Sequence, residues 1–264
     1  MAGAALFEPG GAGVFAPTEA AVGAWDREIV HGAPVAALFA GQLAPAEHTL
    51  ARLTVEFLAP VPHAPLTLEL SSLDGGARVQ RQRAALVHEG RTVATATSVV
   101  VRRGELDLPD KARRHDSPFD PAELPALETR NLASEELIGW PSYDSQGVYL
   151  AWTRIDGDPR PHGWIRLALP VVAGTEISGI ETAAVAADYA QSAINFQLPY
   201  REWSFRNAEL TLHLSREPVG DWIGLRSEGV VQPVGAGFNA ADLFDADGRV
   251  GRSASSLVVE RRSA

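Results

Sequence analysis

Cysteine is absent from this chain of 264 residues, and methionine occurs only once. Without a thiol the chain can form no disulfide, no thiolate-bound metal site and no cysteine nucleophile. It also has no run of about 18 apolar residues, which is the length that a membrane-spanning helix needs. The first residues lack the basic region and apolar core of a signal peptide, so we expect a cytoplasmic protein.

Positive charge is scarce as well. The 23 Lys and Arg residues are outnumbered by 33 Asp and Glu residues, which gives a formal net charge of −10. A general nucleic-acid-binding protein would show a basic face, so this class is disfavoured. Hydrophobic residues make up 45% and charged residues 21% of the chain, which is typical of a folded globular protein.

Several catalytic and ligand-binding motifs are also missing. The chain has no Gly-x-Ser-x-Gly nucleophile motif, and its glycine-rich segment Gly10–Gly13 lacks the lysine of a phosphate-binding loop. The seven histidines are scattered without the spacing of metal ligands. We therefore expect no metal and no bound organic cofactor.

An internal repeat is the most informative feature of the sequence. Ala51–Phe57 resembles Ala208–Leu214 at an offset of 157 residues (208 − 51), and Ala96–Arg103 resembles Ala254–Arg261 at an offset of 158 (254 − 96). Two separate matches at nearly equal offsets indicate a tandem duplication of one structural unit. We predict a first unit over residues 1–104, a second over 149–264, and a proline-dotted linker over 105–148.

Each unit begins with an alanine-rich helical stretch, over Pro34–Gln42 in the first and Ile180–Ala193 in the second. Ser178 and Glu181 fit a capping box, Ser-x-x-Glu, at the start of the second helix. Alternating strands follow each helix, and hairpin turns are expected at His88–Gly90 and Asp245–Gly248.

The strands suggest how the units associate. One face of the first repeat strand carries Leu53, Val55 and Phe57, and the same face of the second carries Leu210, Leu212 and Leu214. This order predicts an α+β fold in which each antiparallel sheet curls around one helix. Pairing the units edge to edge would give one continuous sheet and cover an open strand edge.

The motifs also resemble those of a known family. The segment Trp25–Asp26 followed by His31–Leu38, and the strand Arg52–Pro62, are similar to motifs of TesB-like acyl-CoA thioesterases, which are double hotdog proteins of the thioesterase-like superfamily. The second half resembles this family through Trp203–Phe205, Ala208–His213, Arg216–Pro218, Asp221–Trp222 and Asp247–Ser253.

The resemblance implies a hydrolase of lipid metabolism that cleaves fatty acyl-CoA to a free fatty acid and CoA. Such chemistry needs a base for water, hydrogen-bond donors for the oxyanion, and a pocket for the acyl chain. Homo-oligomers are common for such folds, but no interface can be identified in the sequence.

Asp188 is the best candidate for the base. It is the only acid within the apolar run Ala183–Ala190, and burial would raise its pKa. The resemblance implies that Asp188 belongs to a water-activating triad. Its counterpart in the first half of the repeat is Leu38, so only one half keeps the acid. The alternative is an Asp on the solvated side of the helix.

Two further triad members follow from the resemblance. Thr211 matches a strand hydroxyl, although a β-branched residue in a strand is often only a strand former. The family carries a Gln on the last strand where this chain has Ser255 and Ser256, and the register favours Ser255. This departure motivates an alternative function, a non-catalytic acyl-thioester-binding protein that has lost the full triad.

Substrate-binding candidates lie near both helices. His31, Gly32 and Ala33 stand at the start of the first helix, where backbone amides favour an oxyanion or phosphate, and His31 could instead be a capping residue. Asn195 and Phe196 follow the second helix and could line the pocket. Other candidates for the CoA phosphates are the arginines Arg201, Arg206 and Arg216.

A third possibility is a hotdog hydratase that adds water to an enoyl-thioester. That chemistry needs an acid and a His near one helix start, and His31 has no matching Asp in its own helix. The hydratase is therefore the least favoured of the three hypotheses.

Overall fold

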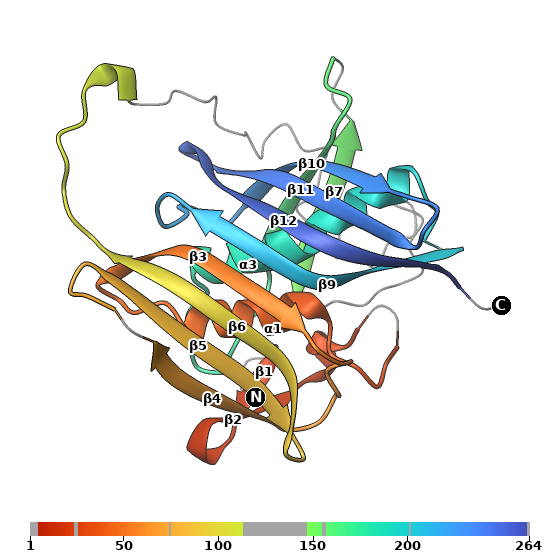
Figure 1. Ribbon diagram of the computed structural model, residues 1–264, viewed down its shortest axis with the longest axis horizontal. Coiled ribbons are helices and arrows are strands. Elements are labelled where there is room, and N and C mark those ends of the chain that lie inside the picture. The colour runs from red at the N-terminus through yellow and green to blue at the C-terminus, as the bar shows by residue number, and fades with distance from the viewer. Residues whose placement is uncertain are drawn as a thin grey trace.

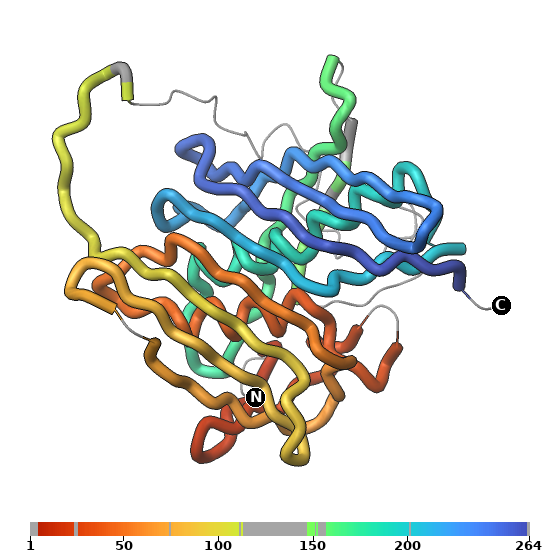
Figure 2. The backbone as a smooth tube through the Cα atoms, viewed as in Figure 1, coloured from red at the N-terminus to blue at the C-terminus, as the bar shows by residue number. Residues whose placement is uncertain are grey.

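The structure is a computed structural model, and it describes residues 5–23, 26–73, 75–112, 147–154, 157–200 and 202–262 (Figure 2). Trp25, Arg201 and most of the predicted linker lie outside these described residues. The predicted boundaries of the two units therefore stay a prediction.

The described part of the first half contains one α-helix, α1 (Gly32–Gln42), and short 3-10 turns at Gly11–Gly13 and Glu19–Ala21. A further 3-10 turn, Asp110–Ala112, lies in the described start of the predicted linker. Its strands are β1 (Phe7–Pro9), β2 (Val14–Pro17), β3 (His48–Phe57), β4 (Leu66–Leu73), β5 (Val79–His88) and β6 (Arg91–Arg102).

The described part of the second half contains α3 (Gly179–Tyr189), which continues directly into a 3-10 helix, η6 (Ala190–Phe196). Its strands are β7 (Val148–Arg154), β8 (Pro161–Leu167), β9 (Trp203–Leu214), β10 (Ile223–Val231), β11 (Ala236–Asp245) and β12 (Gly248–Arg261).

The twelve strands of the described residues form one antiparallel sheet in the order β1-β2-β4-β5-β6-β3-β9-β12-β11-β10-β8-β7. The order of the second half mirrors that of the first, and the two halves join where β3 pairs with β9. At this junction Thr54 pairs with Thr211, and their hydroxyls are 3.1 Å apart. The predicted edge-to-edge pairing of two repeated units into a continuous sheet is therefore confirmed.

The two helices lie side by side against the sheet (Figure 1). Both are buried along nearly their whole length. Their many alanines allow this close packing, because small side chains bring helix and sheet backbones together. The α+β class with one central helix in each half is as predicted. No helix of the described ranges is long and apolar enough to cross a membrane.

The helix boundaries differ from the predicted ones for local reasons. Helix α1 begins at Gly32 because the side chain of His31 caps it. Helix α3 starts at Gly179 after the predicted capping box of Ser178 and Glu181, which is confirmed. The predicted hairpin turns are present as well, and Gly90 and Gly248 have the positive φ angles that these turns require.

Candidate active site

Asp188 lies on the last turn of α3, and its side chain is buried, with the residue only 1% exposed. The alternative of a solvated helix stripe is therefore wrong. Burial disfavours the charged carboxylate and raises the pKa of Asp188 from 3.8 to about 7. A carboxyl group with this pKa can both accept and return a proton near neutral pH.

Two neighbours fix the orientation of this carboxyl group. The amide of Asn207 on β9 donates a hydrogen bond of 2.7 Å to Oδ1 of Asp188 and one of 3.1 Å to its backbone oxygen. Gly32, the first residue of α1, leaves room for Oδ1, because a Cβ at this position would lie 2.5 Å from that oxygen. The carboxyl group is therefore held between the start of one helix and the sheet.

His31 caps α1 and also contacts the carboxyl group. Its Nδ1 accepts a hydrogen bond of 3.0 Å from the amide of Ala33 and lies 3.3 Å from Oδ2 of Asp188. The ring stacks on Tyr189, with centroids 4.8 Å apart. Burial lowers the pKa of His31 to about 3, so the ring is neutral at physiological pH.

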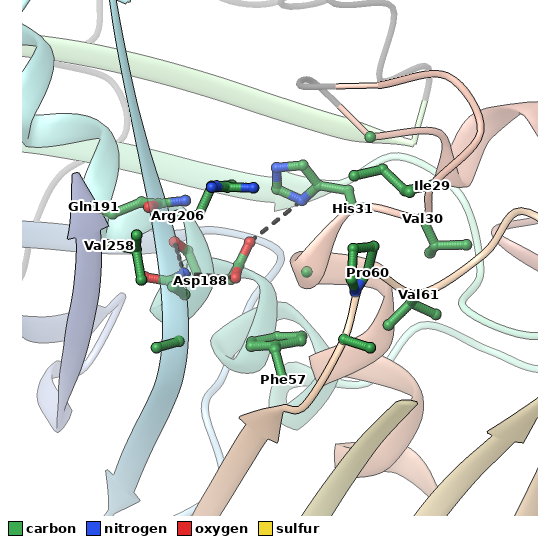
Figure 3. A pocket seen from close by; sticks show the side chains of 15 residues that line it. Ile29, Val30, His31, Phe57, Pro60, Val61, Asp188, Gln191, Arg206 and Val258 are labelled. Carbon is green, nitrogen blue, oxygen red and sulfur yellow. Dashed lines mark hydrogen bonds and ion pairs between the residues drawn. The ribbon is translucent and has the colours of Figure 1, made fainter. Parts of the chain in front are cut away.

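A cavity of about 260 Å³ opens beside these groups, between the two halves of the chain (Figure 3). His31, Gly32, Asp188 and Asn207 line its polar end. The rest of the wall is mostly apolar and includes Ile29, Val30, Phe57, Pro60, Val61 and Val258. An apolar cavity with a few convergent polar groups is the usual form of a small-molecule site.

The start of α1 supplies hydrogen-bond donors to this cavity. The first amides of a helix have no partner within the helix and carry positive partial charge. The amide of Ala33 is engaged by His31, and Pro34 has no amide hydrogen. This leaves the amide of Gly32, a cavity-lining residue, as the donor suited to a developing oxyanion.

Two protein-family models match the chain. Residues 21–101 match the acyl-CoA thioesterase N-terminal domain, and residues 109–259 match the acyl-CoA thioesterase C-terminal domain. The chain belongs to the acyl-CoA thioesterase family. This confirms the resemblance to TesB-like proteins, and it supports thioester hydrolysis as the general chemistry.

Solved structures support the double hotdog fold of this family member. A thioesterase II candidate from Thermobifida fusca has a TM-score of 0.72 at 19% identity, covering 97% of this chain and 95% of its own. A hot dog fold protein from Alicyclobacillus acidocaldarius has a TM-score of 0.69 at 17% identity, and the match covers 95% of this chain and 93% of that protein. TesB2, an acyl-CoA thioesterase II from Mycobacterium marinum, has a TM-score of 0.64 at 13% identity, and the match covers 96% of this chain and 93% of that protein. The search of curated protein sequences found no match.

Thr211 does not lie beside Asp188 in the structure of this thioesterase-family member. Leu210 and Leu212 are buried towards the helices, so Thr211 between them points to the opposite face of the sheet. There its hydroxyl lies 3.1 Å from that of Thr54. The triad role predicted for Thr211 is therefore not supported by its position.

The serines of β12 also lie away from the cavity. Ser255 is buried and pairs with Leu210, while Ser256 points outward and donates to Glu209 at 2.8 Å. The residue of β12 that pairs with Asn207 is Leu257. Neither serine therefore occupies the position beside the Asp188–Asn207 pair.

The remaining predicted binding residues are dispersed. Asn195 and Phe196 end η6 outside the cavity, and Phe196 is 37% exposed. Arg206 lines the cavity at its exposed rim and pairs with Glu260. Arg216 pairs with Asp245 beyond the other end of β9, so Arg206 and Arg216 do not form the predicted cluster.

Two polar residues that line the cavity, Asn207 and Gln191, were not identified from the sequence. Asn207 was overlooked because an irregularity in the pairing of β9 and β12 changes the alternation of side chains beside it. Gln191 lies three residues after Asp188 and lines the same cavity. Its sequence signal was its spacing of nearly one helical turn from the acid.

Helix position also corrects the counterpart of Asp188 in the first half. Both helices have eleven residues, and Asp188 is the tenth of α3, so its counterpart is Gly41, the tenth of α1, rather than Leu38. A Cβ on Gly41 would lie 2.6 Å from Oε1 of Glu181. The equivalent space at the other end of the helices therefore holds the carboxyl group of Glu181, which caps α3.

Proposed function

We propose that this protein is an acyl-CoA thioesterase that hydrolyses fatty acyl-CoA to a free fatty acid and CoA, with Asp188 as the general base. The observation that carries the proposal is a buried carboxyl group, with its pKa raised to about 7, at the polar end of an apolar cavity. Membership of the acyl-CoA thioesterase family supports the same reaction class.

The reaction would proceed by general base catalysis. The Asp188 carboxylate takes a proton from water as the water oxygen attacks the thioester carbon. The amide of Gly32 stabilises the negative charge that develops on the carbonyl oxygen. The carbon–sulfur bond then breaks, and the leaving thiolate takes the proton back from Asp188, which restores the carboxylate.

The rest of the cavity suits the two ends of the substrate. The apolar wall formed by residues such as Ile29, Val61 and Phe57 fits a hydrocarbon chain. Arg206 at the rim is suited to a phosphate of CoA, because a guanidinium group matches phosphate oxygens.

Hydrolysis of an acyl-CoA series, followed by release of the free thiol, tests this function. Acyl chains of increasing length identify the preferred tail, and the same acyl groups on a carrier protein show which thiol carrier is used. We expect turnover of CoA thioesters that saturates with substrate. Saturable binding without turnover would instead identify the non-catalytic acyl-thioester-binding protein.

One observation favours the hydratase as a second candidate. His31 of α1 does meet an acid, because Asp188 of α3 lies 3.3 Å away. However, Nδ1 of His31 accepts the Ala33 hydrogen bond, so the neutral ring carries its proton on Nε2. Because Nδ1 is engaged and Nε2 is protonated, neither ring nitrogen is well suited to act as a base. Hydration of a 2-enoyl-CoA without release of CoA would favour this second function.

A further inference from the structure

Gln191 has a buried oxygen atom without a hydrogen-bond partner among the described residues. The residue is 7% exposed, and its Oε1 accepts no hydrogen bond within the part of the chain that the structure describes. Buried polar atoms in folded proteins nearly always have a partner, and each exception needs an explanation. Because Gln191 lines the candidate active-site cavity, the missing donor is expected to come from that cavity.

Asp188 presents a second acceptor of the same kind. Its Oδ1 is held by Asn207, whereas Oδ2 accepts no hydrogen bond of ordinary geometry among the described residues. The nearby backbone amide of Ala33 lowers the pKa of the carboxyl group but donates its hydrogen bond to His31. Nδ1 of His31 lies 3.3 Å from Oδ2, but this nitrogen already accepts a hydrogen bond from the Ala33 amide. While Asp188 is ionised, Nδ1 of His31 and Oδ2 of Asp188 are both acceptors, so no hydrogen bond forms between them.

The two unpaired acceptors belong to the same side of one helical segment. Gln191 follows Asp188 by three residues, and η6 continues from α3 without a break, so the two side chains are neighbours on its surface. Figure 3 shows the Gln191 side chain extending towards Arg206 and Asp188 along the edge of the cavity. A ligand that fits both oxygens must bring two hydrogens.

We propose that Oε1 of Gln191 and Oδ2 of Asp188 hold the attacking water between them, each accepting one of its two hydrogens. Gln191 is then a catalytic residue of the proposed thioesterase, and this inference rests on that function. With both hydrogens held, a lone pair of the water oxygen is left for the thioester carbon. Asp188 takes its hydrogen during attack, and the other stays on the oxygen that becomes part of the fatty acid.

The neutral amide is suited to this position. A carboxylate there would repel the charge of Asp188 and raise the pKa of the base further. An apolar side chain of similar size would fill the space without accepting the hydrogen. The variants Gln191→Glu and Gln191→Leu therefore separate the role of the acceptor from the role of the volume.

Steady-state kinetics on the full-length protein test the inference, together with binding of a non-hydrolysable thioether analogue of acyl-CoA. We expect Gln191→Leu to lower kcat about 10²-fold through loss of water orientation, with the Kd of the analogue and the Tm unchanged. Gln191→Glu should recover much of kcat at alkaline pH, with its pH profile moved upward. The control is Gln197→Leu, because Gln197 donates to Gly229 outside the cavity and should keep the parent kcat.

The outcomes distinguish this inference from the function on which it rests. If the parent hydrolyses acyl-CoA and Gln191→Leu is equally fast, the role of Gln191 is overturned and the thioesterase stands. If kcat falls only together with Tm and analogue binding, Gln191 is structural and the inference is also overturned. If the parent hydrolyses no acyl-CoA, the proposed function itself fails.

Discussion

The amide of Asn207 on β9 donates a hydrogen bond of 2.7 Å to Oδ1 of Asp188 on α3. This bond fixes one carboxyl oxygen and lowers the pKa of Asp188, against the larger effect of burial that raises it. The position of Asn207 therefore controls both the direction of the base and the pH at which it is ionised.

Replacement of Asn207 by leucine should slow the reaction at neutral pH. A hydrogen bond to a charged group is worth about 1.5–3 kcal/mol, so we expect kcat/KM at pH 7 to fall about 10- to 100-fold. Loss of the bond raises the pKa of Asp188, and the pH–rate profile should move to higher pH. Steady-state rates between pH 5 and 9 measure both effects.

Two other substitutions serve as controls for Asn207. Thr211→Val changes a residue on the opposite face of the sheet, and Ser255→Ala changes one that does not line the cavity. Both should keep kcat/KM within about twofold of the parent. A large loss of activity in Thr211→Val, with Asn207→Leu fully active, would restore the triad that the sequence predicted.

The two glycines at the ends of α1 offer a matched pair. Gly32→Ala would place a Cβ 2.5 Å from Oδ1 of Asp188, and Gly41→Ala would place one 2.6 Å from Oε1 of Glu181. Each substitution must displace a carboxyl group of α3. Only Gly32→Ala displaces the base, so it should lower kcat about 10²-fold, whereas Gly41→Ala should mainly lower Tm. Equal losses of kcat in the two variants would argue against a special role for Asp188.

Asp188 should also make stability depend on pH. Its pKa in the folded protein, about 7, lies above its ordinary value of 3.8, so the unfolded chain releases this proton first as pH rises. The free energy of unfolding therefore falls between about pH 4 and pH 7, on the order of a few kcal/mol in total. Urea unfolding of the parent and Asp188→Asn should show a stability advantage of the variant that grows from pH 5 to about pH 7 and is constant at higher pH. An advantage independent of pH would contradict the raised pKa.

Phe57 should limit the length of the acyl chain. It lines the apolar part of the cavity at the end of β3, so Phe57→Ala enlarges the space for a hydrocarbon tail. Each additional buried methylene is worth about 0.8 kcal/mol, and we expect the preferred chain to lengthen by two or more carbons. Rates across the acyl-CoA series measure this change. Leu214→Ala, the repeat counterpart at 57 + 157, should lower Tm and leave the chain-length preference unchanged.

The repeated architecture could be predicted from the sequence because repetition and alternation are local patterns. The faces defined by Leu53 and Leu210, the capping box of Ser178, and the junction of the two sheets all follow from such patterns. Burial of Asp188 followed in the same way from the apolar run around it.

The partners of Asp188 could not be predicted because they come from segments far apart in the chain. Asn207 reaches the carboxyl group only because the pairing of β9 with β12 shifts next to it. A shift of one residue moves a side chain to the other face of the sheet, so simple alternation along β9 does not place Asn207 beside the helices. Thr211 and Ser255 were expected from the family resemblance and not from the strand pattern. The contact of His31 with Asp188 depends on how the two helices pack, which no local pattern specifies.

The role of Asp188 as the general base is decided by the pH dependence of kcat/KM for the preferred acyl-CoA, measured in the parent and in Asp188→Asn. We expect the parent rate to rise with pH through a midpoint near 7, and Asp188→Asn to be slower by about 10²- to 10⁴-fold. An Asp188→Asn protein that hydrolyses the substrate as fast as the parent would exclude Asp188 as the base.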